Sequence, residues 1–178
     1  SGEGGVITTK NTKIAKNIKL YRSHGIFRHK EKYWMYDVLK HGFNYRISDI
    51  NCALGLSQLN KISLFLKKRK LIYKKYVNEL ENFNSNLIIP KYSKAIKPSF
   101  HLFLIKIKFD NLKKNKDHFM KYLMKYNISA QQHYIPTYKF KIYKENEYHF
   151  PGSEEYFKDS VSIPIFVNLG SKDQNKII

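Results

Sequence analysis

The chain has 178 residues, of which 42% are hydrophobic and 15% aromatic, a composition that predicts a folded protein and excludes a disordered one. No apolar run approaches the roughly 20 residues that span a bilayer. The single cysteine, Cys52, excludes a disulfide framework and a thiolate metal site. We therefore expect a protein of a reduced, cytoplasmic compartment that does not enter a membrane.

The net charge of +19 raises the possibility of a lysine-rich nucleic-acid-binding domain, because a basic surface attracts phosphate. Of the 33 basic residues all but four are lysines, and these are scattered along the chain. Arginine, the usual bidentate reader of phosphate and guanine, is scarce. A solvated lysine-rich surface is therefore the preferred interpretation, and we expect no nucleic-acid partner.

The first third of the chain begins with a glycine-rich turn at Gly2–Gly5 and a short predicted strand at Val6–Thr9. Asn11 or Thr12 can cap a helix, which has one apolar face made by Ile14, Ile18 and Tyr21. Residues 23–43 are polar and aromatic without a clear period, and they predict an ordered loop.

A helix start at Ser48–Asp49 combines a capping side chain with a carboxylate in the first turn. A helical pattern of apolar residues then runs from Ile50 to Leu80 and predicts one long helix. We expect it to end or bend near Asn82 to Asn86, and Pro90 closes the segment.

After Pro98 the pattern predicts strands alternating with helices. Strands are expected at 100–109, 128–134 and 162–165, and helices at 113–126, from 151 and from 171. The helix at 113–126 should turn four apolar side chains inward: Phe119, Met120, Leu123 and Met124. Such an order predicts an α+β or two-layer sandwich.

The segment Gly42–Arg46 lies directly before the strongest helix start of the chain. Asn44 offers amide donors and Arg46 a rigid guanidinium fork, and both suit phosphate or carboxylate oxygens. The alternative is that Asn44 makes a turn and Arg46 a salt bridge.

A second polar segment follows the predicted strand at 128–134. Gln131, Gln132, His133 and Tyr134 carry four hydrogen-bonding side chains just before Pro136, and they could line the site of a polar ligand. The alternative is a half-exposed strand end. No histidine pair has the spacing of a helical metal site, so we expect no metal.

In their order along the chain, several segments resemble the DegT/DnrJ/EryC1/StrS family of sugar aminotransferases. The resemblance rests on Gly2–Thr9, Leu20–Gly25 with its Arg22-Ser23-His24-Gly25 motif, Asn44–Leu59, His133–Pro136, Pro151–Phe157 and Ser162–Ile165. The last three are similar to the branch that makes UDP-4-amino-4,6-dideoxy-N-acetyl-β-L-altrosamine for pseudaminic acid.

The resemblance implies the C-terminal part of a fold-type-I transferase of the α/β class that uses pyridoxal 5'-phosphate (PLP). Residues 1–60 would end the large PLP-binding domain, 61–85 would form a connecting helix, and 86–178 would form an α+β small domain. The lysine that holds the cofactor as a Schiff base would lie shortly before Ser1. No catalytic residue is therefore expected in the chain, which would be inactive alone.

The family also implies roles for both polar segments. Asn44 would reach across a homodimer with shared active sites to the partner's cofactor phosphate and substrate. Gln131, Gln132, His133 and Tyr134 would contact the substrate. The reaction would transfer an amino group from L-glutamate to C4 of a UDP-4-keto-6-deoxy-N-acetylhexosamine. A nucleotide-sugar-binding relative without catalysis remains the alternative.

Overall fold

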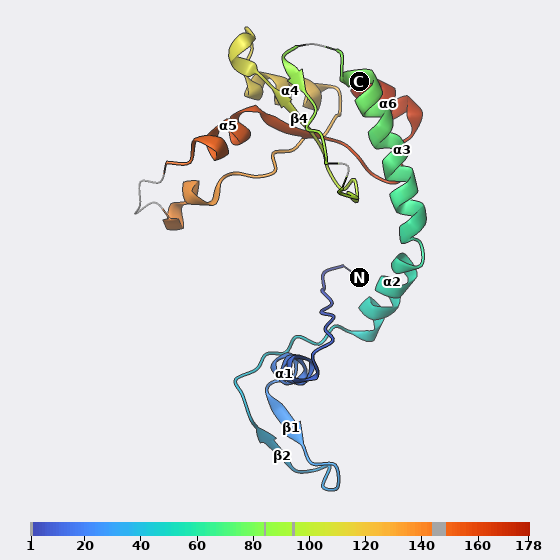
Figure 1. Ribbon diagram of the computed structural model, residues 1–178, viewed down its shortest axis with the longest axis vertical. Coiled ribbons are helices and arrows are strands. Elements are labelled where there is room, and N and C mark those ends of the chain that lie inside the picture. The colour runs from blue at the N-terminus through green and yellow to red at the C-terminus, as the bar shows by residue number, and fades with distance from the viewer. Residues whose placement is uncertain (1, 84, 94, 144–148) are drawn as a thin grey trace. The chain divides into compact units, whose positions relative to one another are not determined.

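The computed structural model describes residues 2–83, 85–93, 95–143 and 149–178 (Figure 1). The chain forms two compact units, residues 1–62 and 63–178. Among the helices of these described ranges, none is long and apolar enough to cross a membrane.

The first unit contains two helices and a hairpin: α1 (Thr12–Arg22), β1 (Ile26–Arg28), β2 (Tyr36–Val38) and α2 (Asp49–Leu59). Both predicted helix starts are confirmed. The side chain of Asn11 accepts hydrogen bonds from the backbone N–H groups of Lys13, at 2.9 Å, and Ile14, at 3.1 Å. Ser48 Oγ accepts from the backbone N–H of Asn51 at 3.3 Å. These caps satisfy donors that the first helical turn leaves unpaired.

Two predictions for this unit are wrong. Residues 23–43 are not a plain loop, because β1 and β2 pair in antiparallel fashion within them. All of β2 and most of β1 are exposed, so the hairpin lacks the alternation by which a strand is recognised. Val6–Thr9 forms no strand. Val6 is 90% exposed, and no neighbouring strand in the described part of the chain pairs with the segment.

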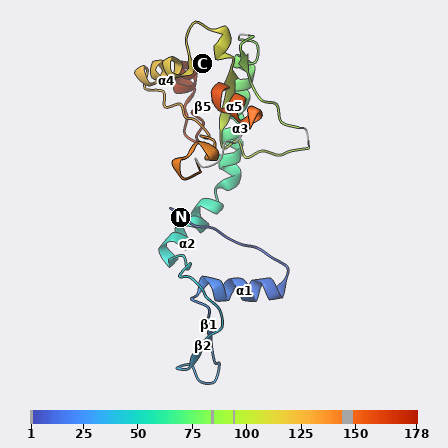
Figure 2. The same ribbon diagram turned by 90° about the vertical axis from the view of Figure 1, so that its left-hand side faces the viewer.

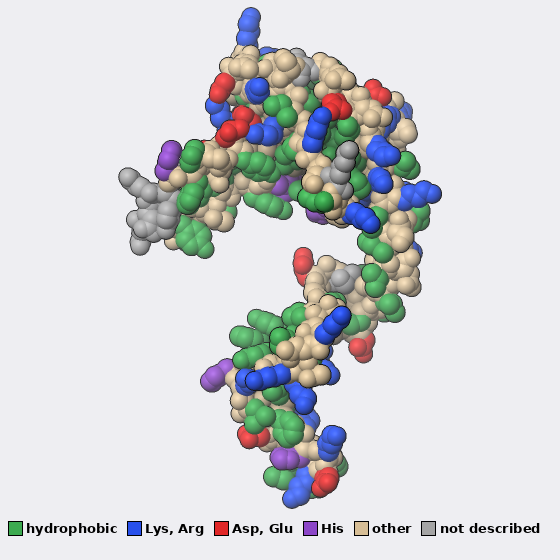
Figure 3. Space-filling model, in the orientation of Figure 1, with side chains coloured by type: hydrophobic (Ala, Val, Ile, Leu, Met, Phe, Trp, Pro, Cys, Tyr) green, Lys and Arg blue, Asp and Glu red, His purple; other side chains and the backbone are tan. Residues whose placement is uncertain are grey.

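The first unit has almost no interior of its own. Within residues 2–62 the structure shows one buried residue, Gly25. Large apolar side chains are exposed instead, and Figure 3 shows such side chains in green on the surface of this unit. Burial of apolar surface is the main force that stabilises a fold, so this unit needs a further surface to cover it.

The second unit is a three-stranded antiparallel sheet with helices. Its strands are β3 (Leu87–Ile88), β4 (Phe103–Ile107) and β5 (Ser160–Ile163), in the order β3-β4-β5. Its helices are α3 (Ile62–Leu80), α4 (Lys116–Lys125), α5 (Pro151–Asp159) and α6 (Ser171–Ile177), visible in Figures 1 and 2. Short 3-10 turns lie at Phe109–Asn111, Thr137–Lys139 and Lys141–Tyr143.

The core of this unit lies between α3 and one face of the sheet. Tyr76 of α3 and Phe103 of β4 are both fully buried, and their ring centroids are 4.7 Å apart. The Tyr76 hydroxyl donates a hydrogen bond to the Pro164 carbonyl at 2.8 Å, so its polar end is satisfied. The same cluster includes Ile72, Leu80, Ile105, Ile107, Val161 and Ile163.

The predicted long helix is in fact two helices, because α2 ends at Leu59 and α3 begins at Ile62. Asn60 caps the end of α2, and asparagine competes with helical hydrogen bonds through its own side chain. The predicted strand at 128–134 is reduced to one bridge between Gln131 and Ser162. Met124 is 67% exposed rather than inward. The predicted α/β fold class is confirmed.

Strands β4 and β5 have two chemically different faces. Phe103 pairs with Ile163 and Ile105 with Val161, and these apolar residues belong to the core. Side chains alternate along a strand, and in β5 Ser160 and Ser162 alternate with Val161 and Ile163. The two serines therefore point to the opposite face of the sheet. These two buried serines hold the segment that contains the predicted substrate residues.

Candidate functional site

The segment Gln131–Tyr134 lies against the serine face of β5. Gln131 and Ser162 exchange two backbone hydrogen bonds of 2.9 and 2.8 Å, which add the start of the segment to the sheet. The Gln131 side chain is exposed and makes no hydrogen bond within the described part of the chain. The segment is thus fixed through its backbone at this end, and the Gln131 amide is available to a ligand.

Gln132 is half-buried, and both ends of its side-chain amide have partners inside the unit. Its oxygen accepts a hydrogen bond from the Lys116 ammonium, and its nitrogen donates to Ser160 Oγ at 3.2 Å. Because Ser160 is only 1% exposed, this contact anchors Gln132 in the interior. The amide that the sequence predicts to contact substrate is therefore already engaged.

Lys116 ties α4 to this segment and to α5. Besides Gln132 it donates to the backbone carbonyl of Phe157, and its ammonium lies 5.1 Å from the centre of the Phe157 ring. Partial burial lowers the pKa of Lys116, and the nearby carboxylates of Asp159 and Asp117 oppose that shift. The ammonium is thus held mainly by neutral oxygens and an aromatic face.

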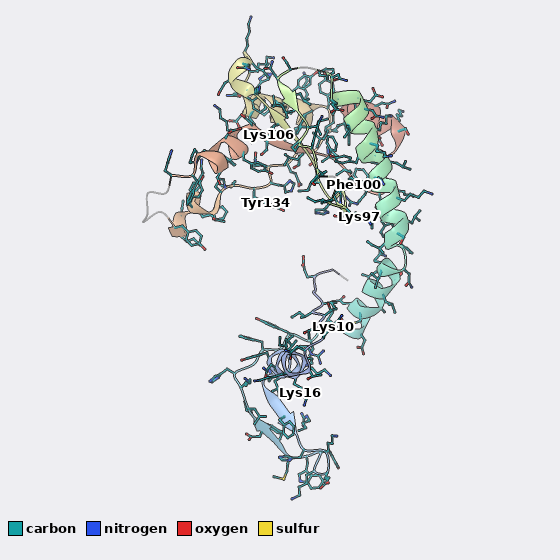
Figure 4. The ribbon with its side chains drawn as sticks, in the orientation of Figure 1. Lys10, Lys16, Lys97, Phe100, Lys106 and Tyr134 are labelled. Atoms are coloured by element: carbon teal, nitrogen blue, oxygen red, sulfur yellow. The ribbon has the colours of Figure 1, made fainter. Side chains whose placement is uncertain are left out.

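His133 is held on both sides. Its Nδ1 lies 2.8 Å from Ser162 Oγ, and its backbone carbonyl accepts a hydrogen bond from the Tyr156 hydroxyl at 3.0 Å. These contacts leave Nε2 as the ring nitrogen for a ligand, able to donate or accept according to the tautomer. Tyr134, labelled in Figure 4, is 72% exposed, and its ring meets the His133 ring edge-on at 4.7 Å.

A cavity of about 650 Å³ opens beside this segment. Gln131 and His133 line it, whereas Gln132 and Tyr134 are not among its described lining residues. Arg69 also lines the cavity and donates to three backbone carbonyls, those of Phe100, His101 and Ile165, at 3.0 to 3.2 Å. The guanidinium therefore joins α3 to two other segments and gives the cavity a fixed positive charge.

Asn44 belongs to the first unit and follows the hairpin. Its backbone forms a bridge with Ser23, and its exposed side chain makes no hydrogen bond within the described residues. The rings of Phe43 and Tyr45 stack at 4.8 Å with an 8° angle between their planes. These neighbours therefore share one face of an extended segment, and Asn44 points to the other.

Arg46 contacts a histidine rather than a carboxylate. Its Nη2 lies 3.3 Å from His24 Nε2, and none of the ion pairs in the described residues involves Arg46. The salt bridge considered as an alternative for Arg46 is therefore not formed. The free amide of Asn44, with a guanidinium two residues away, suits an oxyanion such as a phosphate.

The sequence interpretation missed Lys116, Tyr156, Ser160 and Ser162, which hold the predicted site residues. One signal for the serines is present, because Ser160–Ile163 alternates serine with valine and isoleucine. That alternation is typical of a strand with one polar face. Lys116 gives no such signal among 33 basic residues, because only its position in space distinguishes it.

Comparison with known proteins gives a consistent assignment. The model of the DegT/DnrJ/EryC1/StrS aminotransferase family matches residues 1–178. A UDP-4-amino-4,6-dideoxy-N-acetyl-β-L-altrosamine transaminase of Campylobacter jejuni is 36% identical over 96% of this chain and 45% of its own length. The chain spans about half the length of the curated relatives it matches.

Solved structures agree with this result. Helicobacter pylori PseC, an aminotransferase involved in pseudaminic acid biosynthesis, is similar with a TM-score of 0.85 and 28% identity, over 95% of this chain and 45% of that one. Spr1654 from Streptococcus pneumoniae in its PLP form shares the fold, with a TM-score of 0.83 at 20% identity, over 95% and 42% of the two chains. The family match over the whole length, the α/β fold and these likenesses lead to one conclusion: the chain belongs to the DegT/DnrJ/EryC1/StrS aminotransferase family.

Proposed function

We propose that this chain is the C-terminal part of a PLP-dependent transaminase that moves an amino group from L-glutamate to C4 of a UDP-4-keto-6-deoxy-N-acetylhexosamine. The observation that carries the proposal is the family match over all 178 residues, with a UDP-sugar transaminase among the relatives. We place the protein in the cytoplasm and in nucleotide-sugar biosynthesis for pseudaminic acid.

The proposed domain division follows from this function. Residues 1–60 would complete a large PLP-binding domain, 61–85 would connect, and 86–178 would form the small domain. The nearly absent interior of the first unit supports this view, because its apolar side chains need cover from a larger domain or a second subunit. The rest of the large domain and the second subunit of a homodimer with shared active sites would provide this cover. The lysine that binds PLP would precede residue 1.

The residues of the first unit fit the cofactor's phosphate. Asn44 presents an exposed amide without a partner among the described residues, and Arg46, two residues further along, adds a positive charge. We therefore assign Asn44 to cofactor and substrate binding. When bound, PLP would supply the electron sink for amino transfer, and this chain would contribute binding and orientation.

In the second unit we assign Gln131, His133 and Tyr134 to the sugar nucleotide. Gln131 and His133 line the cavity, and Ser162 fixes the His133 ring so that Nε2 can bond a sugar hydroxyl or an N-acetyl group. Gln132, which the sequence places in the same set, would act through its contacts to Lys116 and Ser160.

The test separates the two halves of the reaction in the intact protein. Both halves would share the cofactor, but only the keto-sugar half would use the contacts that we assign to Gln131 and His133. His133→Ala should lower kcat/KM for the keto sugar about tenfold to a hundredfold, the value of one or two hydrogen bonds. Its effect on the glutamate half-reaction should be small.

Single-turnover absorbance of the cofactor with each substrate separately measures the two halves. His149→Ala, an exposed histidine of the same unit, is the matched control and should leave both unchanged. Equal losses in both halves would assign His133 to the fold or the cofactor. A protein without a lysine before the Gly2–Gly5 turn would instead be the non-catalytic relative.

A further inference from the structure

The motif Arg22-Ser23-His24-Gly25 has no assigned role, and the structure shows what it contacts. Helix α1 ends at Arg22, after which His24 and Gly25 adopt left-handed backbone conformations with φ of 62° and 70°. The chain reverses there, because left-handed residues bend the backbone away from the helix. Residues 21–24, at the end of the helix and in this turn, lie beside residues 43–45, which include Asn44.

Three backbone hydrogen bonds join the two segments around Asn44. The Phe43 N–H donates to the Tyr21 carbonyl at 2.7 Å and the Tyr45 N–H to the Arg22 carbonyl at 2.9 Å. In the other direction the His24 N–H donates to the Phe43 carbonyl at 2.9 Å. Both neighbours of Asn44 are thus bonded to the motif, which fixes the direction of the Asn44 side chain.

Two glycines allow this close approach. A Cβ on Gly25 would lie 1.7 Å from the Lys40 carbonyl oxygen, and one on Gly42 would lie 2.2 Å from the Gly25 nitrogen. Both distances are far inside van der Waals contact, and the atoms are backbone rather than mobile side chains. Only glycine therefore lets the segments lie side by side.

The side chain of His24 adds the last contact. Its Nε2 lies 3.3 Å from Arg46 Nη2, and the guanidinium, always protonated, can only donate. A hydrogen bond between the two groups therefore has the guanidinium as its donor and His24 Nε2 as its acceptor. This contact holds the guanidinium of Arg46, which lies two residues after Asn44 in the sequence.

We propose that the Arg22–Gly25 motif is a positioning device for Asn44, with His24 acting through Arg46 and the backbone of residues 42–45. This inference rests on the proposed role of Asn44 toward the cofactor phosphate. His24 is thus a positioning residue, whose loss weakens phosphate binding only while Asn44 is present to be positioned.

The experiment is a double-mutant cycle in the intact protein, read as the equilibrium dissociation constant of PLP rather than as activity. His24→Asn is the test variant, because asparagine tolerates a left-handed backbone and removes only the imidazole contact. His29→Asn makes the same exchange at another exposed histidine of the first unit and serves as the control. Asn44→Ala supplies the second arm of the cycle.

His24→Asn should weaken PLP binding about threefold to tenfold, the range for one hydrogen bond, and this loss should disappear in the Asn44→Ala background. His29→Asn should have no effect. A loss of equal size in both backgrounds, or no loss from His24→Asn while Asn44→Ala weakens binding, overturns the positioning role alone. If Asn44→Ala leaves PLP affinity unchanged, the proposed role of Asn44 fails and the positioning role falls with it.

Discussion

Replacing Gln132 with leucine tests whether its amide stabilises the second unit. The change keeps the side chain's approximate size but removes the acceptor of the Lys116 ammonium and the donor to Ser160. Lys116 keeps the Phe157 carbonyl and ring, whereas Ser160 is almost completely buried and loses a partner. The variant should therefore lose stability rather than only ligand affinity.

The size of the loss follows from the two contacts. A hydrogen bond to a charged group contributes about 1.5–3 kcal/mol and a neutral one about 0.5–1.5 kcal/mol. Leucine buries some apolar surface in return, so we expect the free energy of unfolding to fall by about 2–4 kcal/mol. If the free energy of unfolding falls by about 2 kcal/mol per M of urea, the urea concentration at the unfolding midpoint should decrease by about 1–2 M.

The assay is urea denaturation of the 178-residue chain followed by circular dichroism. Gln131→Leu is the matched control, because the adjacent glutamine is exposed and its side chain makes no hydrogen bond among the described residues. It should change the free energy by less than about 0.5 kcal/mol. Equal midpoints for the two variants would refute an interior role for the Gln132 amide.

Further predictions concern the core and the cofactor. Phe103→Ala should cost about 3–5 kcal/mol in urea denaturation, because Phe103 is fully buried. Leu123→Ala should cost about 2–4 kcal/mol, whereas Met124→Ala, at a 67% exposed position of the same helix, should cost under about 1 kcal/mol. Burial raises the pKa of Tyr76, so its contribution is complete below pH ~10 and is lost as pH rises above it. Tyr76→Phe should therefore flatten the alkaline fall of the unfolding midpoint, and an unchanged slope would contradict this. Asn44→Ala in the intact protein should weaken PLP binding by about 1–3 kcal/mol, measured by cofactor absorbance on dilution.

Local signals in the sequence predicted most helices and the main strand. The starts of α1 and α2 were identified from Asn11 and Ser48, because a cap is a short-range interaction between neighbouring residues. The strand β4 was recognised from its alternating pattern. The hairpin of β1 and β2 was missed, because exposed strands carry no apolar face that would reveal them.

The candidate site was predictable in position but not in the use of each side chain. The polar run of Gln131–Tyr134 predicts a site segment, and the structure places Gln131 and His133 beside a cavity, yet nothing in the run distinguishes Gln131 from Gln132. The difference arises because Gln132 meets Ser160 and Lys116, residues that the fold brings from 28 and 16 positions away. Contacts of this range depend on the pairing of Gln131 with Ser162 and on the position of α4, which the sequence pattern does not specify.

The alternation along β5 also has a consequence for motion. Its valine and isoleucine belong to the core while its serines hold Gln132 and His133, so the site segment cannot shift without disturbing the most protected strand of the unit. Amide hydrogens there should exchange with solvent only through global opening, on the slow scale that core strands show. The His133 ring is bonded to this strand through Ser162, so a ligand of the proposed site would meet a ring nitrogen that is already in place.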